Sequence, residues 1–141
     1  MSGTQGSTAR RNSAQQVGYF RFKVNFNDGG TVSAAVLKKQ WAPAGAVFLR
    51  ASVYKTAAWN SATSAALSVG LVGGAGNELV NAADVKTATG LVAGTLAAGA
   101  LAPLAADTQL QASVAFVGAP TAGAAYVVIE YVCDNDLNAG T

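Results

Sequence analysis

Few residues in this sequence could do acid–base, nucleophilic or metal chemistry, and their types exclude most catalytic arrangements. The chain has no histidine, which removes the commonest general base and the commonest metal ligand. Its single cysteine, Cys133, lies in an alternating apolar stretch and has no histidine to activate it. We therefore expect Cys133 to be a small core residue, and a zinc site of the usual kind is excluded.

The carboxylates are the remaining candidates for chemistry. Their spacing selects no pair of the kind that a glycosidase needs, and most of them fall at expected turns, where Asp has structural reasons to occur. Asp134 and Asp136 form a D-N-D-x-N pattern that could bind Ca²⁺, but the Gly and Glu that complete an EF-hand loop are missing. We expect no catalytic residue, no cofactor and no metal, with calcium at this pair as the alternative. The seven carboxylates are Asp28, Glu78, Asp84, Asp107, Glu130, Asp134 and Asp136.

Two other features resemble ligand sites. The glycine-rich residues 70–76, GLVGGAG, are followed by neither Lys-Ser/Thr nor a helical pattern, so turns explain them better than a phosphate loop. Trp41 and Trp59 both fall in expected turns. A tryptophan there either forms a platform for a sugar or, more often, caps one end of a sandwich core.

Alternation of apolar and polar residues predicts the strands that position these side chains. In residues 19–26, YFRFKVNF, the side chains of Phe20, Phe22, Val24 and Phe26 share one face, which should point at a second sheet about 10 Å away. Residues 27–30, NDGG, favour a tight hairpin turn, and the return strand is expected at residues 31–37.

Further strands are expected along the rest of the chain. In residues 46–56, strict alternation would place Val47, Leu49, Ala51 and Val53 on one face and Phe48, Arg50, Ser52 and Tyr54 on the other. Residues 110–117 and 124–133 also alternate, whereas residues 77–98 could hold two short strands or one helical turn. Leu67, Val69 and Leu71 share one face of another strand.

This pattern predicts an all-β fold, an antiparallel β-sandwich of the jelly-roll type. About seven to nine short strands are separated by turn signals every 8–12 residues or so, and no long helical pattern occurs. We expect one jelly-roll domain at residues 17–135, preceded by a flexible N-terminal arm at residues 1–16 and followed by a polar tail at residues 136–141. No signal peptide and no membrane-spanning stretch is expected.

The composition bears on the partners. Charged residues make up 11% of the chain, well under the ~25% of an ordinary soluble domain. A surface of small neutral residues suits packing against another protein, because little charge must be desolvated, although a low-charge β domain would have the same composition. A net charge of +2, with no run of more than two basic residues, does not suggest a specific nucleic-acid partner.

Several segments together resemble a known family. Taken in order, they are similar to the small cement, or decoration, proteins of tailed phages, those of short-tailed Bordetella phages in particular. The resemblance covers about residues 17–133, and it rests on turn and strand patterns. The segments are residues 43–47 (PAGAV), 67–70 (LSVG), 77–80 (NELV), 106–108 (ADT), 121–123 (TAG) and 127–131 (VVIEY).

The resemblance implies a structural virion protein with a jelly-roll fold. Such a protein binds the outside of the capsid, bridges neighbouring major capsid protein subunits and stabilises the head against DNA pressure. It would be made in the cytoplasm of the host bacterium and act on the capsid exterior, often as a homodimer, with no membrane partner.

No motif marks the contact residues, so they are a hypothesis. The arm would order across capsid subunits, basic side chains would form rim contacts that face solvent or an acidic capsid patch, and exposed strand edges or outer-face aromatics would form the dimer. The candidates are Arg10, Arg11, Arg21, Lys23, Lys38, Lys39, Trp41, Phe48, Arg50, Tyr54 and Trp59.

Two other functions compete with this hypothesis. The chain could be a carbohydrate-binding module of a phage head-fibre or tail protein, with Trp41, Trp59 or Tyr54 as stacking platforms. An enzyme is disfavoured because the sequence has no catalytic constellation.

Overall fold

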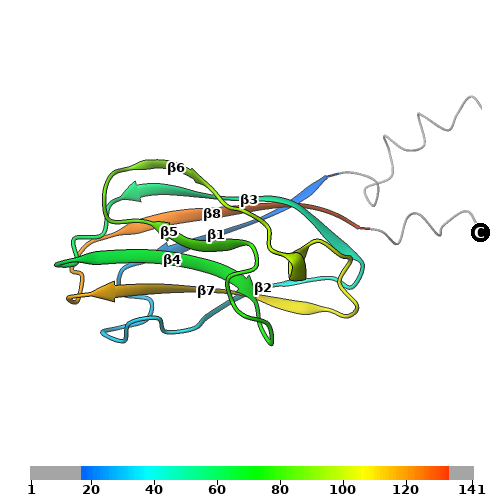
Figure 1. Cartoon of the computed structure of the whole chain (residues 1–141), viewed down its shortest axis with the longest axis horizontal. Coiled ribbons are helices and arrows are strands. Elements are labelled where there is room, and N and C mark those ends of the chain that lie inside the picture. The colour runs from blue at the N-terminus through cyan, green and yellow to red at the C-terminus, as the bar shows by residue number, and fades with distance from the viewer. Residues whose placement is uncertain (1–16, 134–141) are drawn as a thin grey trace, which may run out of the picture.

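The computed structural model describes residues 17–133, which form two stacked four-stranded antiparallel sheets (Figure 1). This part of the chain contains eight strands and one short 3-10 helix. They are β1 (Gly18–Asn25), β2 (Leu37–Ala42), β3 (Ala46–Ala57), β4 (Ser64–Leu71), β5 (Val80–Asp84), β6 (Gly90–Ala93), the 3-10 helix η3 (Ala98–Ala100), β7 (Thr108–Val117) and β8 (Ala124–Cys133). The arm at residues 1–16, the tail at 136–141 and the Asp134/Asp136 pair lie outside the described residues.

The strand order is that of a jelly roll. One sheet has the order β1-β8-β3-β6 and the other β2-β7-β4-β5. Most consecutive strands therefore lie in opposite sheets, and the chain wraps around the core as two Greek keys. The predicted all-β jelly-roll sandwich is confirmed.

The core lies between the two sheets and contains the predicted apolar faces. Phe22 and Val24 of β1 are buried, and Phe20 and Phe26 are partly buried and pack against the core. The inner faces of β4, β7 and β8 complete it with buried aliphatic side chains, as their alternation predicts. These are Leu67, Val69, Leu71, Leu110, Ala112, Val114, Ala125, Val127 and Ile129. Cys133 is half-buried at the end of β8.

The predicted hairpin after β1 is wrong. β1 pairs with β8 and β2 with β7, so the two strands lie in different sheets. Residues 27–30 do turn, but as part of a series in which Asp28 donates to the Asn25 carbonyl, Gly30 to Asn27 and Val32 to Gly29. The series carries the chain from one sheet to the other, and for this reason β2 begins only at Leu37.

The expected alternation in β3 is wrong over its first half. Phe48 pairs with Tyr131 and Arg50 with Glu130, so Leu49 is the extra residue of a β-bulge. The bulge turns Phe48 into the core, where it is 3% exposed, and leaves Leu49 46% exposed. After the bulge the predicted faces hold, with Val53 buried and Tyr54 exposed.

The segment at residues 77–98 holds two short strands, β5 and β6, rather than a helical turn. Trp41, expected in a turn, belongs to the end of β2, and the corner follows at residues 43–45 with Gly45 at a φ of 83°. Within residues 17–133, no helix is long and apolar enough to cross a membrane.

Candidate interaction surface

Every carboxylate among residues 17–133 has a structural partner. Asp107 accepts a hydrogen bond from the Ala44 amide at 2.8 Å and so fixes the corner between β2 and β3. Glu130 accepts from Arg50 Nε at 2.8 Å on the outer face of its sheet. Asp84 accepts from the Lys86 and Thr87 amides and from the Thr87 hydroxyl, in the turn after β5. In this part of the chain no group of three His, Cys, Asp or Glu could hold a metal ion.

The glycine-rich loop binds a carboxylate of its own chain. Glu78 is 7% exposed and accepts from the amides of Leu71 at 3.0 Å, Ala75 at 2.5 Å and Gly76 at 3.1 Å. A Cβ atom at Gly70 would lie 2.1 Å from Glu78 Oε2, so the loop needs glycine to admit this side chain. The amides that a phosphate loop would present are thus occupied by Glu78.

Trp59 caps one end of the core. It is 1% exposed, and its amide donates to the Val85 carbonyl at 2.9 Å. A Cβ at Gly123 would lie 2.4 Å from the indole, so the chain packs directly on the ring. Trp41 and Tyr54, at 62% and 51% exposed, lie on strands of different sheets and do not form one platform.

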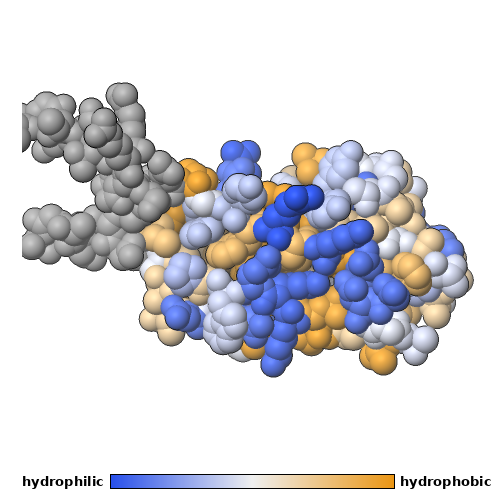
Figure 2. All heavy atoms as spheres, turned by 180° about the vertical axis from the view of Figure 1, so that it is seen from behind, coloured by the Kyte–Doolittle hydropathy of each residue, from blue (hydrophilic) through white to orange (hydrophobic). Residues whose placement is uncertain are grey.

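A basic surface follows the side of the sandwich where β1 and β2 are the edge strands of their sheets (Figure 1). Figure 2 shows hydrophilic side chains gathered across the middle of this side. We call it the basic edge, and it comprises Arg21 and Lys23 of β1 with Lys38 and Lys39 of β2. Asp28, in the turns between these strands, is the carboxylate beside it.

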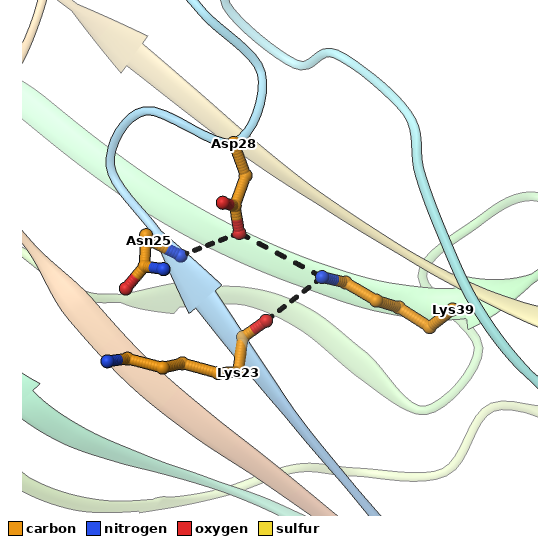
Figure 3. Close-up of polar contacts among 4 residues, drawn as sticks. All are labelled: Lys23, Asn25, Asp28 and Lys39. Atoms are coloured by element: carbon orange, nitrogen blue, oxygen red, sulfur yellow. Dashed lines mark hydrogen bonds and ion pairs between the residues drawn. The ribbon is translucent and has the colours of Figure 1, made fainter.

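Side chains of β2 close the open edge of β1. Because β1 pairs only with β8, its carbonyl groups on the other side need donors. Lys39 Nζ donates to the Lys23 carbonyl at 2.9 Å, and Gln40 Nε2 donates to the Arg21 carbonyl at 2.9 Å. Lys39 Nζ also lies 3.9 Å from Asp28 Oδ2, which accepts from the Asn25 amide at 2.8 Å (Figure 3). The two sheets are therefore joined along this side by polar bonds.

The other three cations of the basic edge differ from Lys39. The Arg21 guanidinium lies 4.4 Å from the centroid of the Tyr126 ring, and Lys23 Nζ lies 5.8 Å from the same centroid. Lys38 is exposed on β2. Within residues 17–133, no ion pair joins Arg21, Lys23 or Lys38 to a carboxylate.

The structure brings some of the predicted contact residues together and removes others. Phe48 and Trp59 are buried, so neither side chain is available to a partner. The outer face of one sheet bears Arg21, Lys23, Arg50 and Tyr54. Strand β2 of the other sheet bears Lys38, Lys39 and Trp41. Arg10 and Arg11 lie outside the described residues.

Sequence reasoning missed the roles of Gln40 and Tyr126. Gln40 satisfies a strand edge and Tyr126 supports two cations. Both roles depend on β1 lying beside β8 in its own sheet and facing β2 across the sandwich. No local pattern carries that signal, because β1 and β8 are far apart in the chain and the contact of β1 with β2 forms only when the two sheets stack.

The fold has clear structural neighbours. A chain in the capsid asymmetric unit of cyanophage Pam1 has a TM-score of 0.63 and 20% identity, and the match covers 82% of this chain and 84% of that one. A chain of the Ralstonia phage GP4 capsid gives 0.62 and 21%, covering 86% and 87%. A chain in the capsid structure of Helicobacter pylori bacteriophage KHP30 gives 0.58 and 12%, covering 82% and 86%.

No protein-family model and no curated protein matches the sequence. At these identities the structural similarity shows a common fold. The jelly roll of residues 17–133 is one that chains in three phage capsid structures also have.

Proposed function

We propose that this protein is a structural component of a phage virion that binds the outside of the capsid and cements neighbouring major capsid protein subunits. The observation that carries the proposal is the extent of the structural match. It covers 82–86% of this chain and 84–87% of chains found in three phage capsid structures. The similarity thus covers most of this chain and most of each matched chain, rather than a local sandwich motif.

The chemistry of the described residues supports a binding role. Each carboxylate of residues 17–133 accepts a hydrogen bond from another residue of the domain, and no histidine is present in the sequence. The low charged fraction, 11%, leaves much neutral surface that can be covered at a small desolvation cost.

Cementing then works through buried area. An interface of standard size buries roughly 1,600 Å² in total. One cement unit that contacts two capsid subunits adds avidity, because release requires both contacts to open together. A homodimer, formed through exposed strand edges or the outer face that bears Tyr54, would extend the same effect to more subunits.

Co-sedimentation tests the proposal. The purified protein is mixed with DNA-filled heads of the phage that encodes it, from which the native copies have been stripped, and the heads are pelleted. We expect saturable pelleting at a fixed ratio to the major capsid protein. Folded protein that stays in the supernatant at every concentration would overturn the proposal. In that case tryptophan fluorescence during sugar titration would test the carbohydrate-binding alternative, with the exposed Trp41 as the reporter.

A further inference from the structure

We infer that the basic edge is a docking surface for an acidic protein surface, and that Arg21, Lys23 and Lys38 are the residues that bind it. The inference rests on the proposed function, since it names the chemistry of the capsid patch that the protein meets. Lys39 and Arg50 carry the same charge but are excluded from this set, because each already has a partner within the domain.

Charge is distributed asymmetrically over the described residues. Seven cations lie among residues 17–133, and four of them belong to the basic edge, where Asp28 is the neighbouring carboxylate. Two of the other three cations interact with carboxylates. Arg50 is paired with Glu130 at 2.8 Å, and Lys55 acts on Asp84 electrostatically. The backbone amide of Lys86, the third, donates a hydrogen bond to Asp84.

One cation of the basic edge, Lys39, already has partners within the domain. Lys39 donates to the Lys23 carbonyl, lies near Asp28 and has a side chain only 17% exposed. It therefore holds β1 against β2 and lies beside Asp28, the carboxylate of the turns between these strands. The charge of Arg21, Lys23 and Lys38 stays unbalanced by any ion pair within residues 17–133.

The strands and one side chain of the basic edge are held in place before any partner binds. The Lys39 and Gln40 bonds to the Lys23 and Arg21 carbonyls join the two strands that bear the free cations. Contact with the Tyr126 ring restrains the Arg21 guanidinium, whose planar fork suits a carboxylate. A partner that binds here has less side-chain motion to restrict, which favours affinity.

The neighbouring side chains favour a protein over a nucleic acid. Tyr19 precedes Arg21 on the same face of β1 and is 66% exposed, and Trp41 follows Gln40 on β2. Exposed Tyr, Trp and Arg are the residue types enriched where proteins bind one another. Three phosphate contacts would give a salt slope of only about −2.7 on duplex DNA, which is small for a nucleic-acid-binding surface.

The test compares neutralised variants in the head-binding assay. The triple variant Arg21→Gln/Lys23→Gln/Lys38→Gln should bind stripped heads about 30-fold more weakly, and Lys38→Gln alone about threefold. Lys86→Gln is the control matched to Lys38→Gln, since it removes one charge at a lysine outside the basic edge, and it should bind as the wild type does. Raising the salt should weaken the wild type more than the triple variant. Thermal melting of each variant checks that the fold is intact.

The possible results distinguish a failure of the proposed function from a failure of the docking-surface inference. Wild-type protein that does not pellet with heads overturns the proposed function and this inference with it. Wild-type protein that pellets, together with a triple variant of unchanged affinity, overturns this inference alone. Retention of the wild type on double-stranded DNA cellulose at physiological salt, lost in the triple variant while head binding is kept, would replace the acidic protein with a nucleic acid.

Discussion

At the scale of single residues, four of the five carboxylates within residues 17–133 accept hydrogen bonds from backbone amides in turns and loops, and Glu130 is the exception. Glu78 shows it best, since a nearly buried charge is tolerated only with several donors. Three backbone amides of the loop between β4 and β5 point at its two oxygens. The side chain thereby orders a loop rich in glycine, which loses much conformational freedom on folding.

Replacing Glu78 should therefore be costly. Glu78→Ala leaves three amides without acceptors, and we expect a loss of about 3 kcal/mol or more in the free energy of unfolding. Glu78→Gln keeps one acceptor oxygen and should lose less. Glu130→Ala, which removes an exposed ion pair, is the control and should lose at most about 1 kcal/mol. Urea denaturation measures all three, and equal losses for Glu78→Ala and Glu130→Ala would contradict this role.

Asp84 makes the turn after β5 sensitive to acid. The pKa of Asp84 lies below its ordinary value of 3.8. The main cause is the hydrogen bond from the Thr87 hydroxyl, followed by the one from the Lys86 amide. A carboxyl with a lowered pKa in the folded state stabilises the fold when ionised. Its contribution is present above about pH 3.8 and is lost as the pH falls through the lowered pKa.

Removing the Thr87 hydroxyl tests this link. In Thr87→Val the pKa of Asp84 should rise toward 3.8, and the variant should lose less stability than the wild type as the pH falls below that value. Carboxyl NMR titration gives the pKa directly. Thr89→Val changes an exposed threonine of the same turn and should leave the titration unchanged. An Asp84 titration unaffected by Thr87→Val would contradict the assigned cause.

At the scale of elements, the β-bulge in β3 decides which side chains enter the core. One extra residue, Leu49, reverses the alternation, so that Phe48 faces inward and Leu49 outward. At the edge of the sandwich, Lys39 and Gln40 donate hydrogen bonds to carbonyl groups of β1. These carbonyls could otherwise pair with a strand of another molecule.

The bulge predicts opposite outcomes for two neighbouring substitutions. Phe48→Asp places a charge in the core and should abolish soluble folded protein. Leu49→Asp changes a half-exposed side chain and should cost about 1 kcal/mol or less. Soluble expression and circular dichroism compare the two variants. If Leu49→Asp abolished folding and Phe48→Asp were tolerated, Leu49 would be the core residue and the bulge would be contradicted.

At the scale of the whole molecule, the first and last described strands lie side by side, with Gly18 of β1 opposite Tyr131 of β8. The described residues therefore begin and end at the same end of the sandwich. The core described for residues 17–133 takes its buried side chains from both sheets of the jelly roll. We therefore expect the stability of the domain not to require the residues that precede β1.

Deleting residues 2–16 tests the role of the N-terminal arm in the proposed function. We expect the domain to keep its melting temperature within a few degrees or so, because the core is unchanged. Binding to stripped heads should weaken, since the arm carries Arg10 and Arg11 toward the capsid under our proposal. Unchanged binding would remove the arm from the interface, and a lost fold would show that the domain begins earlier than Val17.

Much of the fold could be predicted from local pattern. Period-two alternation shows which side chains of β1, β4, β7 and β8 enter the core, because a pleated strand places alternate residues on opposite faces. Missing histidine and the lone Cys133 excluded common catalytic and zinc sites by residue type alone.

Only the tertiary structure decided which strands are partners, where the bulge lies and which cations are free. The residues after β1 favour a turn both in a hairpin and in a jelly roll. Burial of apolar side chains between the two sheets favours the jelly roll, and no short segment of the sequence encodes that burial. Leu49 and Phe48 are both apolar, so only the register with β8 distinguishes them. Lys38 and Lys39 are adjacent and identical in type. They differ because Lys39 reaches the carbonyl of a strand 16 residues earlier in the chain, a contact that exists only when the two sheets have stacked.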